Sequence, residues 1–156
     1  YLVLNWIVLN KNMPFKQGVF KPKLREKYKG KSLPVYRSGW ELKFFRWCDC
    51  NPNILAWNSE GVIIPYKSPL DGRIHRYFVD GLITIKEQTG SKTYLIEIKP
   101  SSQVKAPQPK KYKRKSTMLY EQKMWVVNQA KWEAAEKWAK KKGVEFKILT
   151  EKELNC

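Results

Sequence analysis

Two acidic residues and a lysine near the middle of the chain have the types and spacing for metal-assisted chemistry at a phosphate. Asp80 interrupts one apolar run, and Glu97 and Lys99 end the next one in the order Glu-Ile-Lys. Side chains alternate between the faces of a β-strand, so Glu97 and Lys99 share a face that Ile98 does not. Two carboxylates on one face can hold Mg²⁺, which prefers oxygen ligands. The lysine can stabilise phosphoryl charge or orient the attacking water.

A β-hairpin is needed to position these residues. Residues 77–85 and 93–98 form two apolar runs, separated by a Gly-containing turn at residues 88–91. Two such runs joined by a short turn predict a hairpin. Asp80 is expected within the first strand and Glu97 at the end of the second, so that the two carboxylates face each other at one end of the sheet.

Each of these residues also has a purely structural interpretation. Charges on an exposed face of an edge strand are common, which would account for Glu97 and Lys99. A charge within an apolar run is costly unless it is paired or bound to a metal. Asp80 is therefore either a metal ligand or one partner of a salt bridge, with Arg76 or Lys99 as the other.

An amphipathic helix is predicted over residues 39–49. Ser38 and Glu41 form a capping-box pair at its start, and Asn51-Pro52 ends it. Glu41 is either a metal or water-positioning residue of the site or only the glutamate of this cap. The two roles exclude each other for one side-chain conformation, because a carboxylate bonded to the backbone N–H of Ser38 points away from a metal.

The remaining pattern predicts an α/β fold with a small mixed sheet flanked by helices. Asn128 is expected to cap a second C-terminal helix, and Gly143 stands where a glycine commonly ends one. The pattern predicts strands at residues 54–57, 62–64 and 144–149, helices at residues 116–127 and 129–142, and a loop at residues 100–115.

Composition limits the classes of function. Among 156 residues, 31 are Lys or Arg and 14 are Asp or Glu, a formal net charge of +17. This balance favours a polyanionic partner, nucleic acid first. A single histidine excludes a multi-histidine metal site, and three cysteines without a CxxC pair exclude a disulfide scaffold. No apolar run reaches the length of about 20 residues that a membrane-spanning helix needs. We expect neither a membrane partner nor a small-molecule cofactor.

Three segments are expected along the chain. Residues 1–12 are interpreted as a non-native or disordered extension, because Met13 follows them directly as a candidate start. Residues 13–35 contain many lysines and are expected to form a basic N-terminal arm. Residues 36–156 are expected to form the single catalytic domain.

A second basic segment follows the hairpin and is a candidate nucleic-acid contact. No acidic residue occurs between Glu97 and Glu121. Such a run is either a solvated loop or a surface that binds the DNA backbone without reading sequence. The candidate nucleic-acid-binding residues are Arg76, Lys110, Lys111, Lys113, Arg114 and Lys115.

These motifs resemble those of a known nuclease superfamily. Asp80 followed by Glu97-Ile98-Lys99 is similar to the signature of the PD-(D/E)xK, or restriction-endonuclease-like, nucleases, with Val79 where that signature has proline. A longer series is similar to the head completion nucleases of tailed phages. It includes Tyr36-Arg37-Ser38-x-Trp40-Glu41, Trp57-x-Ser59-Glu60, Arg76-Tyr77-Phe78-x-Asp80, Ile96-Glu97-Ile98-Lys99-Pro100 and Val127-Asn128-x-x-Lys131-Trp132.

The resemblance implies a restriction-endonuclease-like core and a metal-dependent DNA endonuclease that acts after DNA packaging. It implies catalysis by Glu41, Asp80, Glu97 and Lys99, with Mg²⁺, or Mn²⁺ in its place, held by Asp80 and Glu97. DNA and phage head or portal proteins would be the partners. The protein would reside in the virion and the host cytoplasm and would not be secreted.

Two other functions fit part of the sequence. One is a non-catalytic DNA-binding protein of the virion neck, in which the acidic cluster has lost its activity. The other is the endonuclease subunit of a heteromeric transposase, which shares a looser form of the same pattern.

Overall fold

The computed structural model describes residues 17–154. The expected extension at residues 1–12 lies outside this range. The elements, in chain order, are β1 (Gly18–Val19), β2 (Val35–Tyr36), α1 (Gly39–Cys50), β3 (Ile54–Ser59), β4 (Ile63–Lys67), β5 (Ile74–Phe78), β6 (Gly81–Glu87), β7 (Gly90–Ile98), α2 (Ser101–Val104), α3 (Lys115–Lys142), β8 (Glu145–Leu149) and α4 (Glu151–Leu154).

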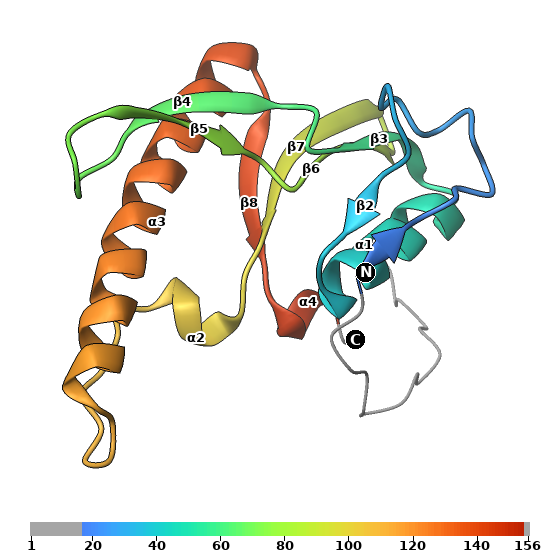
Figure 1. The fold of residues 1–156 in the computed structure, drawn as a ribbon. Helices are drawn as coiled ribbons and strands as arrows, with labels where there is room; N and C mark the ends of the chain where they lie inside the picture. The colour runs from blue at the N-terminus through green and yellow to red at the C-terminus, as the bar shows by residue number, and fades with distance from the viewer. Residues whose placement is uncertain (1–16, 155–156) are drawn as a thin grey trace.

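A four-stranded mixed sheet lies between two helices (Figure 1). Its strand order is β3-β6-β7-β8, with β7 and β8 parallel and the other neighbours antiparallel. Successive side chains of β7 point to opposite faces of the sheet, so the core has two parts. Leu95 packs with Trp132 on the side of α3, and Ile96 packs with Phe44 on the side of α1. The predicted α/β fold with a small mixed sheet flanked by helices is confirmed.

Asp80 does not lie within a strand, contrary to the expectation. The apolar run divides into β5, which pairs with β4 in a separate two-stranded hairpin beside α3, and β6, which enters the main sheet. Val79 and Asp80 connect the two. β6 begins at Gly81, where an added Cβ would lie 2.7 Å from Cε1 of the fully buried Phe44. The chain therefore passes between sheets directly at the candidate site.

Gly81→Ala is expected to destabilise the protein by about 1–3 kcal/mol, because neither β6 nor the buried ring of Phe44 has room to move. Urea unfolding measures this change. Gly39→Ala is the matched control, since no atom lies within 4 Å of a Cβ added there. Equal stability of the two variants would contradict the close contact between Gly81 and Phe44.

The C-terminal part of the chain holds one long helix where two were predicted. α3 runs without interruption past Asn128, which is buried within the helix and not a cap. Burial against the sheet overrides the capping tendency of asparagine there. The helix ends as predicted at Gly143, whose φ of 70° is left-handed. The predicted loop at residues 100–115 begins with the short helix α2.

The described part of the basic segment, residues 17–35, packs against the domain. The buried carboxylate of Asp49 accepts the backbone N–H groups of Lys23 and Leu24 at 2.9 and 3.0 Å. The ring of Tyr28 packs against that of Trp57 of β3 at a tilt of 57°, with ring centroids 4.7 Å apart. These contacts attach the segment to the face of the sheet that α1 covers. Within residues 17–154, no helix is both long and apolar enough to cross a membrane.

Candidate active site

The structure brings together the acidic residues and the lysine that the sequence singles out. Asp80 precedes β6, Glu97 lies near the end of β7, and Lys99 directly follows that strand. The backbone N–H of Ile98 donates to Oδ2 of Asp80 at 2.7 Å, which holds this carboxylate against the end of β7. Nζ of Lys99 lies 3.3 Å from Oε1 of Glu97. The predicted shared face of Glu97 and Lys99 is confirmed, and it is the face toward α3.

Glu97 is a buried carboxylate whose two oxygens have different partners. Its side chain is only 4% exposed, so an exposed strand face does not account for it. Tyr77 of β5 donates its hydroxyl to Oε2 at 2.5 Å, while Lys99 faces Oε1. Burial and the charge of Glu97 raise the pKa of Tyr77 far above its ordinary value, so the phenol stays a hydrogen-bond donor. Tyr77 thereby fixes the orientation of Glu97.

The surroundings of Asp80 disfavour the charged form of its carboxyl group. Burial and the nearby charge of Glu97 raise the pKa of the Asp80 carboxyl well above its ordinary value. No ion pair joins Asp80 to Arg76 or Lys99 in the described part of the chain, so the salt-bridge alternative is not realised. Two neighbouring carboxylates, one of them buried, favour a bound cation.

A second lysine faces the same carboxylates from α3. Nζ of Lys131 lies 5.5 Å from the centre of the Tyr77 ring and 5.7 Å from that of Tyr66. Burial and the charge of Lys99 lower the pKa of Lys131, whereas Glu97 and Asp80 oppose this shift. Two ammonium groups and two carboxylates therefore share one face of the sheet.

Glu41 is engaged in a helix cap beside this cluster. The Ser38 hydroxyl accepts the N–H of Glu41 at 3.1 Å, and Oε2 of Glu41 accepts the N–H of Arg37 at 2.7 Å. The Glu41 carboxylate thus accepts the backbone N–H of Arg37, whereas the sequence suggested that it would accept the backbone N–H of Ser38. Its charge still contributes to the raised pKa of Asp80. Glu41 therefore lies near the carboxylate pair with its oxygens committed to the cap.

Arg37 and Glu60 extend the cluster on the side of α1. Nη1 of Arg37 lies 2.5 Å from Oε1 of Glu60. The N–H of Glu60 donates to the backbone oxygen of Asp80 at 3.3 Å, and Glu60 has a φ of 51°, unusual for a residue with a side chain. Backbone strain of this kind is concentrated at functional sites.

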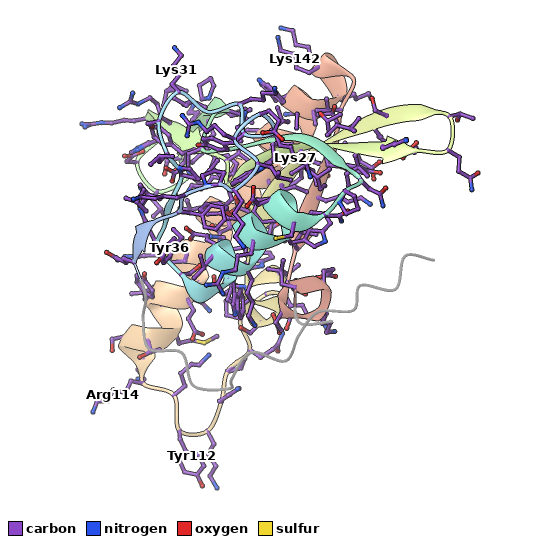
Figure 2. All side chains as sticks on the ribbon, turned by 90° about the vertical axis from the view of Figure 1, so that its right-hand side faces the viewer. Lys27, Lys31, Tyr36, Tyr112, Arg114 and Lys142 are labelled. Carbon is purple, nitrogen blue, oxygen red and sulfur yellow. The ribbon has the colours of Figure 1, made fainter. Side chains whose placement is uncertain are left out.

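The candidate DNA-binding residues do not join the cluster. Arg76 is exposed on the outer face of β5, with its guanidinium 5.5 Å from the centre of the Phe78 ring. The basic segment forms the loop before α3, and Tyr112 and Arg114 project at its tip (Figure 2). At 1.5 Å per residue, Lys115 lies about 24 Å along α3 from Lys131. Lys113 is paired with Glu121, and the other basic side chains of the loop, Lys110, Lys111, Arg114 and Lys115, are exposed.

Sequence reasoning did not assign roles to Tyr77 or Lys131. A signal for Lys131 was present, because it occupies the face of α3 shared by the buried residues Val127, Asn128 and Ala135. A lysine in an otherwise buried helical stripe indicates a functional or paired charge. Tyr77 carried no such signal, since a tyrosine in an apolar strand is ordinary core.

Comparison with known proteins identifies the family of this chain. Residues 51–151 match the family model described as TnsA-like endonuclease N terminal. The head completion nuclease of Enterobacteria phage T4 is 41% identical over 138 residues, which cover 86% of this chain and 90% of the T4 protein. The family model spans Asp80, Glu97, Lys99 and Lys131, whereas Glu41 precedes it. The chain therefore belongs to the TnsA-like endonuclease family, with a restriction-endonuclease-like fold, and shares a family with the head completion nuclease of phage T4.

Proposed function

We propose that this protein is a DNA endonuclease that acts in phage head completion. The family supports nuclease chemistry, and the relative from phage T4 supports the biological role. The observation that carries the proposal is the juxtaposition of Asp80, Glu97 and Lys99 at one end of the sheet. Coverage of 90% of the T4 protein favours head completion over a transposase subunit. Action in the virion or host cell, beside head and portal proteins, is part of the same proposal.

Asp80 and Glu97 would hold a divalent cation, Mg²⁺ or Mn²⁺. The buried carboxylate of Glu97 and the neighbouring one of Asp80, whose charges disfavour each other, fit such an ion. Residues 17–154 contain no group of three or more acidic, histidine or cysteine side chains placed to hold a metal, so two carboxylates would be the protein's share. This suits Mg²⁺, which keeps several waters and often takes one or two carboxylates. When bound, the ion supplies charge neutralisation at the phosphate and a nucleophilic water at neutral pH.

The remaining residues would assist at the phosphate. Lys99, oriented by Glu97, would stabilise the charge that develops on the phosphoryl oxygens or orient the attacking water. Glu41 would contribute as a third carboxylate only after leaving the N–H of Arg37, so its proposed role is secondary to that of Asp80 and Glu97.

The test of this proposal is cleavage of supercoiled and linear DNA by the full chain at low salt. Mg²⁺, Mn²⁺ and EDTA are compared in parallel, together with a DNA-binding assay. Cleavage that requires the metal is expected. DNA binding without cleavage under any metal would instead support the non-catalytic role in the virion neck.

The exposed basic loop before α3 is expected to bind the DNA backbone. Replacing Lys110, Lys111 and Arg114 with glutamine would reduce the slope of log affinity against log salt by about 2–3, since each phosphate contact contributes roughly 0.9. Fluorescence anisotropy over a salt series measures this slope. Replacing Lys140, Lys141 and Lys142, at the opposite end of α3, removes the same charge and is the control (Figure 2). Equal losses in both variants would mean that only net charge matters.

A further inference from the structure

Lys131 occupies an unusual position for a lysine. It lies on the face of α3 that packs against the sheet, one residue before the buried Trp132 and four before the fully buried Ala135. Its side chain is half-buried, whereas Lys137 on the same helix is exposed and pairs with Glu133 at 2.7 Å. The helix thus directs one lysine inward, toward the carboxylates, and the other into solvent.

Among residues 17–154, the contacts of Lys131 leave its ammonium without a hydrogen-bond acceptor. The rings of Tyr66 and Tyr77 approach it at 5.7 and 5.5 Å, and no carboxylate of the described chain lies within ion-pair distance. Lys99 differs, because its ammonium faces Oε1 of Glu97 at 3.3 Å. The half-buried ammonium is partly shielded from water and has no protein acceptor, so an anion brought to Lys131 would be bound favourably.

The residues around Lys131 indicate which anion its ammonium would bind. The ring of Tyr77 lies beside Lys131, and the hydroxyl of the same residue bonds Oε2 of Glu97, so the lysine faces the carboxylate pair across one tyrosine. The charges of Lys99, Glu97 and Asp80 all act on its ammonium. An anionic group at the carboxylate pair would therefore also lie near Lys131.

We propose that Lys131 binds a non-bridging oxygen of the phosphate that is cleaved, a role separate from that of Lys99. This inference rests on the proposed nuclease function. Tyr66 and Tyr77 hold the ammonium by cation–π contacts and leave its N–H donors for the phosphate. Lys99 remains coupled to Glu97, so the two lysines act on different groups of the site.

The experiment compares Lys131→Met, Lys131→Arg and the control Lys137→Met in two assays. Single-turnover cleavage of a duplex with Mg²⁺ or Mn²⁺ measures the rate, and DNA affinity in EDTA over a salt series measures phosphate contacts. Lys131→Met is expected to slow cleavage by about 10²-fold. It should also reduce the salt slope by roughly 0.9, the contribution of one phosphate. Lys131→Arg retains a cation and should recover the salt slope and most of the rate, while Lys137→Met should match wild type.

The outcomes separate the role of Lys131 from the proposed function. Cleavage by Lys131→Met within threefold of wild type, with an unchanged salt slope, would overturn the phosphate contact while leaving the nuclease intact. A melting temperature well below wild type in both Lys131 variants would show a structural role and also overturn it. A wild-type protein that cleaves no DNA would overturn the nuclease function. In that case an unchanged salt slope of Lys131→Met in EDTA would also overturn the phosphate contact, and a reduced slope would support it.

Discussion

Asp80→Asn is expected to abolish DNA cleavage and to raise the melting temperature of the metal-free protein. Loss of a group that acts at the reacting phosphate should reduce the cleavage rate by roughly 10³-fold. The gain in stability arises because asparagine removes a buried charge that faces Glu97, while its side-chain oxygen can still accept the N–H of Ile98. For a chain of this size, about 1 kcal/mol corresponds to a rise of about 2–4 °C.

The stability difference between Asp80→Asn and wild type should depend on pH with a defined sign. The pKa of Asp80 is raised in the folded protein, so its contribution to stability is fully present below its ordinary pKa of 3.8 and is lost as pH rises through the folded value. The advantage of asparagine should therefore be largest at neutral pH and shrink toward acid pH. Thermal unfolding in EDTA between neutral and acid pH measures this trend.

Metal addition and a surface variant are the controls for Asp80. Mg²⁺ or Mn²⁺ should raise the melting temperature of wild type, because a ligand that binds the folded state stabilises it, and should do little for Asp80→Asn. Asp71→Asn removes an exposed carboxylate whose pKa is lowered by the N–H of Arg73 and by His75. That variant should cleave DNA normally and gain no stability. A metal response of Asp80→Asn equal to that of wild type would contradict the assignment of Asp80 as a ligand.

Lys99→Met is expected to lower the cleavage rate by about 10²–10³-fold while DNA affinity changes only a few-fold. The ammonium lies beside Glu97 at the site, so its loss removes stabilisation of charge that develops during the reaction more than binding of the ground state. Single-turnover rates and anisotropy on the same duplex separate the two effects.

Lys92→Met is the matched control for Lys99. Lys92 lies in β7, the strand that Lys99 directly follows, and pairs with Glu145 at 2.6 Å, away from the carboxylate pair. The Lys92→Met variant removes the same charge as Lys99→Met and should leave the cleavage rate close to that of wild type. Equal losses of rate in the two variants would mean that general electrostatics, and not the position of Lys99, accounts for its effect.

Local patterns were sufficient for many elements. The capping pair at Ser38 and Glu41 predicted α1, and Gly143 predicted the end of α3. Alternation along β7 placed Glu97 and Lys99 on one face. These predictions succeeded because capping and strand alternation depend on residues that are close in the chain. The uninterrupted α3 was missed, because burial of Asn128 depends on the distant sheet.

By itself, the sequence determined which residues are candidates for the chemistry and that Glu97 and Lys99 share one face. Only the tertiary structure decided how they meet. Asp80 lies between two sheets because β5 pairs with β4 while β6 pairs with β3 and β7, pairings between segments apart in the chain. The inward position of Lys131 likewise depends on packing of α3 against the main sheet and the β4–β5 hairpin. Burial and charge at the site arise from such long-range contacts, and a local pattern does not encode them.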